Sequence, residues 1–205
     1  MMKLYFIRHG ITENNTQQRF NGGNTHSPLT EEGIKKLRKT KAFLENQGIA
    51  FSKIYVSPQQ RAIDTMKHIV SQELQDTTPI FYNEHLREIF FGQWEGQLFE
   101  PLLSHPQVQN LRYYPNDYDP SEFGGEDYRS LLARGKSFLE ELDYNDDENY
   151  LIVGHGVMLT CLLQSLKGAE LPDIRKDGII HNGSVSVVEV SQDGTKSVQI
   201  FNLLP

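Results

Sequence analysis

Residues 150–166, YLIVGHGVMLTCLLQSL, decide the fold class of this chain. Tyr150–Val153 is a short apolar run typical of a buried strand, and Val157–Leu166 is an apolar stretch long enough for a helix. Gly-His-Gly at 154–156 joins the two, so a polar histidine comes directly after the strand. A buried strand that leads at once into a buried helix is the unit from which parallel α/β sheets are built.

The same alternation extends through most of the sequence. Lys3–Ile7 is a β-prone run that ends at Arg8 and His9, and Ser57-Pro58 resembles an N-cap followed by proline at the first helical position. We therefore expect an α/β fold: a three-layer α/β/α sandwich with a mainly parallel central sheet, formed by residues 1–205 as a single domain. The expected strands are 3–7, 53–56, 79–82, 150–153, 184–190 and 196–201, the last two forming a hairpin around Asp193-Gly194; the expected helices are 31–47, 58–74, 126–142 and 157–166.

Composition and charge narrow the class of protein. A chain of 205 residues with 38% hydrophobic residues is expected to be globular. Its net charge of −7 argues against nucleic acid and anionic membranes as partners, because both favour a basic face. Cys161 is the one cysteine, which rules out an intramolecular disulfide, and its apolar surroundings indicate a buried structural thiol. Residues 1–7 are too short for a signal peptide and no apolar run could span a bilayer, so we expect a cytoplasmic protein.

Residues 100–127 interrupt the regular alternation. The segment contains several prolines and aromatic residues and the pair Gly124-Gly125. We expect a lid-like insertion that packs over a site or forms a pocket wall. Tyr113, Tyr114 and Tyr118 are equally consistent with ordinary packing and with lining that pocket.

The two histidines that follow strands give the first indication of function. Ligands of parallel sheets bind beyond the carboxyl ends of the strands, where His9 and His155 are expected. A neutral imidazole is a competent nucleophile for a phosphoryl group. The planar guanidinium of an arginine, such as Arg8 or Arg61, matches the geometry of the phosphoryl oxygens. Glycines next to both histidines would allow close backbone approach, and acids near Glu88 could protonate a leaving oxygen.

Five blocks in order resemble the histidine phosphatase superfamily, in its phosphoglycerate mutase-like branch. Residues 8–15 (RHGITENN) resemble its R-H-G-x-T-x-x-N signature, and 57–62 (SPQQRA) its S-P-x-x-R-A block. Residues 86–96 (LREIFFGQWEG) resemble its L-x-E…F-G-x-W-E-G block, 154–156 its G-H-G block, and 181–184 (HNGS) its N-x-S segment. The resemblance covers nearly the whole chain and implies a phosphoglycerate mutase-like fold.

The resemblance also implies roles for single residues. His9 would attack phosphorus and become phosphohistidine, and Glu88 would first protonate the leaving alcohol and then activate water. The implied catalytic residues are His9, Glu88, Arg8, Arg61 and His155. The implied phosphate- and substrate-binding residues are Arg8, Gly10, Asn15, Asn21, Gly22, Arg61, Glu88, His155 and Gly156. The implied activity is that of a metal-independent phosphohydrolase of the histidine acid phosphatase type, with a small phosphorylated substrate, no metal and no cofactor.

Several alternatives stay open for these residues and for the activity. An isolated histidine at a strand end is more often a satisfied core residue, and Glu84 and Glu95 lie close to Glu88 in sequence. A cofactor-dependent phosphoglycerate mutase is the main alternative to a phosphatase. It is disfavoured because its usual tyrosine is replaced by Phe91 and because the insertion offers one arginine, Arg112, rather than a pair. A catalytically silent phosphate-binding module and a metal-dependent hydrolase are further options, and the oligomeric state is open, a homodimer included.

Overall fold

A six-stranded sheet forms the centre of the computed structural model, which describes residues 1–144 and 148–205. The strand order is β3-β2-β4-β1-β5-β6, and the first four strands are mutually parallel. β5 runs antiparallel to β1 and continues into the terminal hairpin with β6. The strands are β1 (Met2–Arg8), β2 (Lys53–Val56), β3 (Ile80–Tyr82), β4 (Asn149–Gly154), β5 (Val185–Val190) and β6 (Lys196–Leu203).

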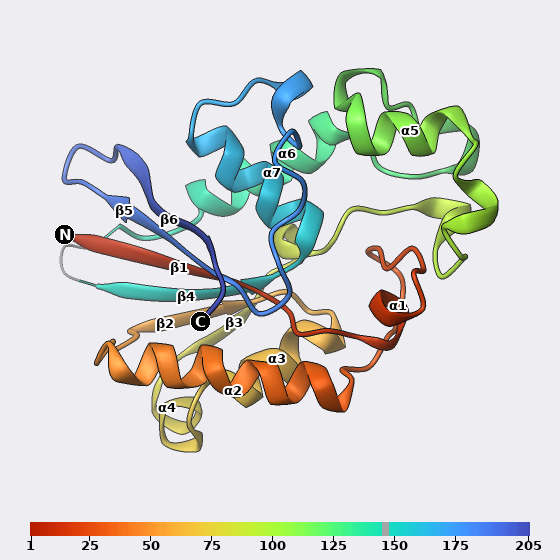
Figure 1. Cartoon of the computed structure of the whole chain (residues 1–205). Coiled ribbons are helices and arrows are strands. Elements are labelled where there is room, and N and C mark those ends of the chain that lie inside the picture. Colours follow the sequence, from red (N-terminus) through yellow and green to blue (C-terminus); the bar gives the residue numbers. More distant parts are fainter. Residues whose placement is uncertain (145–147) are drawn as a thin grey trace.

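Helices cover both faces of the sheet, which confirms the predicted three-layer α/β/α sandwich (Figure 1). In β1, Leu4 and Phe6 join one apolar cluster while Tyr5 and Ile7 join another, as the two-residue period of a strand buried on both faces requires. One face packs against α2 (Glu31–Asn46), α3 (Gln60–Ile69) and the short α4 (Gln72–Thr77), and the other against α6 (Tyr128–Glu140) and α7 (Gly156–Leu166).

The register of the parallel strands brings their carboxyl ends to one level. Ile7 pairs with Val153, and Val56 pairs with the same Val153. The chain leaves β1 at Arg8 and β4 at Gly154, which are also register partners. Residues that follow these strands therefore meet at one edge of the sheet.

One predicted helix is divided in two. The sequence indicates a single helix over 58–74, but α3 ends at Ile69 and α4 begins at Gln72. Val70 is extended (φ −105°, ψ 133°), and the Ser71 side chain accepts a hydrogen bond from the Leu74 N–H to begin the new helix. A serine that caps a following turn competes with continuation of the helix, and hydrophobic spacing alone does not reveal this.

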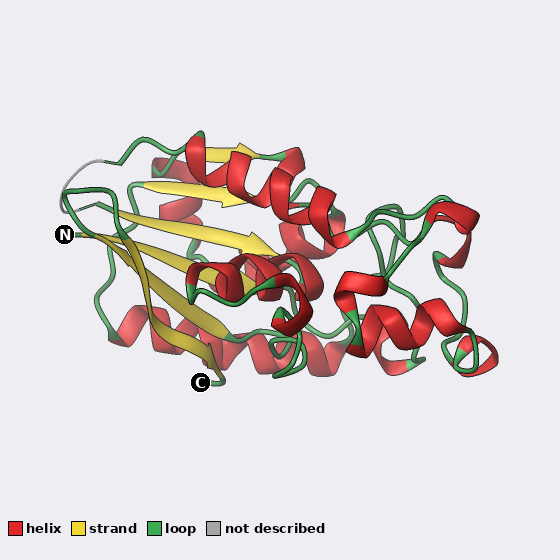
Figure 2. Cartoon of the chain, turned by 90° about the horizontal axis from the view of Figure 1, so that it is seen from above, coloured by secondary structure: helices red, strands yellow, loops and turns green. Residues whose placement is uncertain are grey.

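The 100–127 segment lies beyond the carboxyl ends of β1 and β4 (Figures 1 and 2). It holds α5 (Pro106–Tyr113) between short 3₁₀ turns, and the Phe123 ring stacks on Trp94 with centroids 3.7 Å apart. Gly92 makes this contact possible, because its φ is +55° and a Cβ there would lie 2.0 Å from the Phe123 carbonyl oxygen. The Tyr118 side chain is buried and belongs to the ordinary packing of this segment.

No helix within the described ranges 1–144 and 148–205 is long and apolar enough to cross a membrane.

Candidate active site

His9 and His155 are neighbours at the edge of the sheet. The backbone N–H of His9 donates to the Gly154 carbonyl oxygen at 2.9 Å, which aligns the two turns that follow β1 and β4. The two rings are 5.2 Å apart between centroids, and both side chains are buried. The two histidines predicted from their places after strands are thus brought together.

The His9 ring is held as one tautomer. Its Nδ1 lies 2.7 Å from the Gly10 carbonyl oxygen, which can only accept, so Nδ1 carries the hydrogen and Nε2 keeps its lone pair. Burial and the nearby charges of Arg61 and Arg8 lower the pKa of His9 well below its ordinary value of 6.5. The ring is therefore neutral at physiological pH, with a free nucleophilic nitrogen.

His155 is oriented through both of its nitrogens. Arg61 Nε donates to Nδ1 at 3.2 Å, so Nε2 carries the hydrogen and donates to Ser57 Oγ at 2.7 Å. Burial, then Arg61 and His9, lower the pKa of His155 well below 6.5. The sequence indicates that Ser57 is the N-cap residue, and that interpretation is wrong, because α3 begins at Gln60 and its N-cap is Gln59. The Ser57 hydroxyl contacts His155 and also accepts a hydrogen bond from the Gln59 backbone N–H at 3.4 Å.

Arg61 comes from the first turn of α3 and is buried. Its terminal nitrogens donate to the carbonyl oxygens of Thr25 (2.9 Å), Asn21 (3.2 Å) and Gly22 (3.0 Å). Burial lowers its pKa to about 10, which leaves the guanidinium charged at neutral pH. Arg61 therefore anchors the turn that contains Asn21 and Gly22 while it holds His155.

Arg8 is the last residue of β1 and directly precedes His9. Its Nη1 donates to the Ile180 carbonyl oxygen at 2.5 Å, and its buried Nε has no hydrogen-bond partner within residues 1–144 and 148–205. Burial lowers its pKa to about 10, so it too is charged at neutral pH. Gly156 makes room for it, because a Cβ at that position would lie 2.9 Å from Arg8 Cζ.

Two asparagines secure the backbone around His9. Asn182 Nδ2 donates to the carbonyl oxygens of His9 (3.0 Å) and Gly10 (3.3 Å) and to Asn15 Oδ1 (3.3 Å). Asn15 Oδ1 also accepts from the backbone N–H of Thr12, which closes a capping box at the start of α1 (Glu13–Thr16). The sequence identifies Asn182 only as part of the N-x-S segment and gives no sign of its contact with His9.

Glu88 occupies the amino end of α7. Its carboxylate accepts from the backbone N–H groups of Ile89 (2.9 Å), Val157 (3.0 Å) and Met158 (2.9 Å). These three backbone N–H groups fix the position of the carboxylate. Because α7 begins immediately after His155, this arrangement brings the Glu88 carboxylate to the histidine edge of the sheet.

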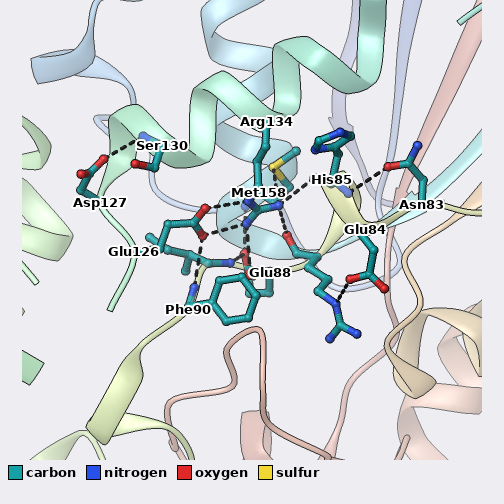
Figure 3. Close-up of polar contacts among 12 residues, drawn as sticks. Asn83, Glu84, His85, Glu88, Phe90, Glu126, Asp127, Ser130, Arg134 and Met158 are labelled. Carbon is teal, nitrogen blue, oxygen red and sulfur yellow. Dashed lines mark hydrogen bonds and ion pairs between the residues drawn. The ribbon is translucent and has the colours of Figure 1, made fainter. Parts of the chain in front are cut away.

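Arg134 of α6 fixes the segment that carries Glu88 (Figure 3). It forms a two-pronged ion pair with Glu126, with Nε–Oε1 and Nη2–Oε2 distances of 2.7 and 2.9 Å. It also donates to three backbone carbonyl oxygens, those of His85 (2.7 Å), Arg87 (2.7 Å) and Glu88 (3.2 Å). Neither Arg134 nor Glu126 belongs to a motif block, so the sequence alone does not single them out.

A cavity of about 540 Å³ adjoins these groups. Val157, whose N–H donates to Glu88, lies in its wall, as do Arg112 and Tyr113 of α5. Tyr113 thus lines a pocket, as one of the two interpretations of the aromatic residues predicts. In residues 1–144 and 148–205, no three or more His, Cys, Asp or Glu side chains gather in a way that could hold a metal ion.

A family model described as the histidine phosphatase superfamily (branch 1) matches residues 4–203. The chain belongs to this superfamily. The family resemblance indicated by the five sequence blocks is therefore confirmed.

Relatives in the histidine phosphatase superfamily include both hydrolases and mutases by name. The adenosylcobalamin/alpha-ribazole phosphatase of Salmonella typhimurium is 29% identical, over 98% of this chain and 96% of that protein. The structure of Bacillus stearothermophilus YhfR superposes with a TM-score of 0.88 at 29% identity, covering 100% of this chain and 98% of that one. The structure of phosphoglycerate mutase from Bacillus anthracis superposes with a TM-score of 0.79 at 26% identity, covering 99% of this chain and 93% of that one. The predicted phosphoglycerate mutase-like fold is confirmed.

Proposed function

We propose that this chain hydrolyses phosphate monoesters of small metabolites through a phosphohistidine formed at His9. The observation that carries the proposal is the state of the His9 ring: it is neutral, it is anchored through Nδ1 to Gly10, and its Nε2 is unprotonated in the field of two charged arginines. Fixed positive charge around the phosphoryl oxygens is the main source of rate enhancement in phosphoryl transfer. Membership of a superfamily with named phosphatases supports the same reaction.

The first half-reaction would transfer the phosphoryl group to the protein. The Nε2 lone pair of His9 forms a bond to phosphorus while the bond from phosphorus to the ester oxygen breaks. Arg8, Arg61 and His155 Nε2–H would contact the phosphoryl oxygens, with Ser57 giving up its bond to His155. The leaving oxygen takes a proton from Glu88, which enters this step as the neutral acid.

The second half-reaction would return the enzyme to its starting state. Glu88 accepts a proton from water, the water oxygen bonds to phosphorus, and the N–P bond to His9 breaks to release inorganic phosphate. We propose that the chain acts as a single domain and that residues 100–127 form a lid-like wall over this site. Asn15, Asn21, Gly10, Gly22 and Gly156 would line the phosphate site.

The direct test is phosphate release from a panel of monoesters in the presence of EDTA. His9→Ala should lose nearly all turnover and trap no acid-labile phosphate, whereas His68→Ala, on the exposed side of α3, is the matched control and should resemble the wild type. A His9→Ala protein that still hydrolyses the esters and still becomes phosphorylated would refute the mechanism. If the wild type hydrolyses none of these esters but is active with a bisphosphoglycerate primer and a phosphoglycerate, the protein is a mutase instead.

A further inference from the structure

Gln59 is a buried amide inside the S-P-x-x-R-A block, at one of the positions that the block leaves open. We propose that Gln59 is a positioning residue for the proton donor, because its side chain fixes the Glu88 backbone against the turn that contains Gly22. The proposal rests on the proposed function for the role of Glu88 as acid and base. It adds to the reaction a residue that lies outside the fixed positions of every motif block.

Both ends of the Gln59 amide are hydrogen-bonded to backbone groups of other segments. Its Nε2 donates to the Gly22 carbonyl oxygen at 3.0 Å, and its Oε1 accepts from the Glu88 N–H at 2.9 Å. A carbonyl oxygen only accepts and a backbone N–H only donates, so these two partners fix the orientation of the amide. Gln59 is 6% exposed, which leaves water little access to either bond. The side chain thus connects Gly22, 37 positions earlier, to Glu88, 29 positions later.

The turn and the Glu88 segment also pack directly against each other. The Gly23 N–H donates to the Ile89 carbonyl oxygen at 2.9 Å. A Cβ at Gly22 would lie 2.7 Å from that same Ile89 oxygen, and one at Gly23 would lie 2.8 Å from the Glu88 carbonyl oxygen. The two backbones therefore meet without side chains between them, and the Gln59 amide determines their relative position at Glu88 itself.

The helix that carries Gln59 does not need a glutamine there. Gln59 is the N-cap residue of α3, yet its side chain makes no capping hydrogen bond. The residues that stabilise a helix from this position are serine, threonine, aspartate and asparagine, so helix stability does not account for the amide. Arg61, two residues later, donates to the same Gly22 carbonyl oxygen at 3.0 Å. One turn of the chain therefore holds both the guanidinium of the phosphate site and the backbone of the proposed proton donor.

Loss of the amide would affect Glu88 more than the turn. The Glu88 N–H would be buried without its acceptor, whereas the Gly22 carbonyl oxygen would keep the hydrogen bond from Arg61. A buried unsatisfied N–H is costly, which favours a shift of the Glu88 backbone toward another acceptor. Proton transfer requires the acid within hydrogen-bond reach of the reacting oxygen. The expected damage is therefore confined to the two steps that use Glu88: protonation of the leaving oxygen and activation of water.

The first experiment compares two esters that differ in their need for a proton. Gln59→Met removes both hydrogen bonds and keeps the length of the side chain. With an alkyl phosphate, kcat/KM should fall about 10- to 100-fold, because the acid is misplaced. With p-nitrophenyl phosphate, whose leaving group needs little protonation, it should fall by less than about threefold. Gln60→Met is the matched control, because Gln60 is exposed and donates to Asp64 at 2.8 Å, and it should match the wild type on both esters.

Rapid mixing with p-nitrophenyl phosphate separates a positioning role from a general loss of structure. Formation of phosphohistidine is spared and its hydrolysis is slowed, so kcat and KM should fall by a similar factor. A burst of about one p-nitrophenol per protein chain should precede the slow turnover. Partial unfolding would instead reduce the burst and leave KM unchanged, which would overturn the inference. Gln59→Leu, which also lacks the amide, is a second variant with the same expected pattern if the methionine variant does not fold.

The outcomes distinguish this inference from the proposed function. Equal losses of kcat/KM on the two esters, or kinetics like those of Gln60→Met, would overturn the role of Gln59 even if hydrolysis depends on His9. Failure of the proposed function has a different signature: His9→Ala would keep its turnover, or the wild type would hydrolyse neither ester. The inference, which rests on that function, would then fall with it.

Discussion

The ion pair between Arg134 and Glu126 allows a quantitative prediction. The two side chains are only 14% and 12% exposed, and Arg134→Met would leave the Glu126 carboxylate without its cation. Removal of one partner from a largely buried ion pair costs about 3–5 kcal/mol of unfolding free energy. For a domain of this size, that loss corresponds to a fall in Tm of roughly 6–20 °C.

The same change should alter catalysis selectively. Arg134 holds the carbonyl oxygens of Arg87 and Glu88, so its loss would displace the carboxyl group that we propose as the proton donor. Esters with poor leaving groups depend most on that proton. Arg134→Met should therefore lose more kcat/KM on an alkyl phosphate than on p-nitrophenyl phosphate, whereas a general loss of structure would lower both alike.

Urea unfolding followed by the fluorescence of Trp94, the one tryptophan, gives the free energies. Arg129→Met, on the exposed side of the same helix, is the control and should change stability by less than about 0.5 kcal/mol. The double variant Arg134→Met/Glu126→Leu should be more stable than Arg134→Met alone, because no unpaired charge is left. An Arg134→Met protein within about 1 kcal/mol of the wild type, or a double variant less stable than the single one, would refute the reasoning.

Three further predictions concern the interior of the site and of α7. The pKa values of His9 and His155 are lowered in the folded protein, so the unfolded chain binds more protons as the pH falls through 6.5. The free energy of unfolding, measured in urea, should therefore fall by about 1.3 kcal/mol per histidine between pH 7.5 and pH 5.5. A free energy that does not change with pH would contradict this. Gly156→Ala should displace Arg8 and lower kcat/KM about 100-fold at a stability cost of about 1–3 kcal/mol, measured by steady-state kinetics and urea unfolding, and unchanged kinetics would show that the guanidinium can move freely. Burial raises the pKa of the Cys161 thiol to about 12, so Ellman's reagent should label it only in denaturant, and rapid labelling of the folded protein would count against a closed core.

The sequence predicts the parts of the molecule that depend on local pattern. The alternation of strands and helices gives the three layers, and the position of His9 and His155 after parallel strands is enough to place them at one edge. Arg61 is found only through its motif block, because nothing in its own helix distinguishes a buried arginine from an exposed one.

Other features of the site are not accessible to sequence reasoning for a physical reason. Glu88 is held by backbone N–H groups of α7, and every residue except proline has such a group, so no sequence pattern announces the contact. Arg112 and Arg175 both line the cavity beside the site. Arg175 donates a hydrogen bond to the carbonyl oxygen of Leu111 in α5, which lies 64 positions earlier in the chain. The break at Val70 depends on a single serine hydroxyl.

The hydrogen bonds that build the site also span nearly the whole chain. Asn182 reaches the His9 carbonyl across 173 positions, Arg61 reaches His155 across 94, and Val157 reaches Glu88 across 69. Contacts of such high sequence separation close large loops and therefore form late and slowly during folding. A fragment contains the complete set of these groups only if it includes residues 9–182. Activity should therefore return only in the final stage of refolding after denaturation. A refolding intermediate with most of its helices formed should still be inactive.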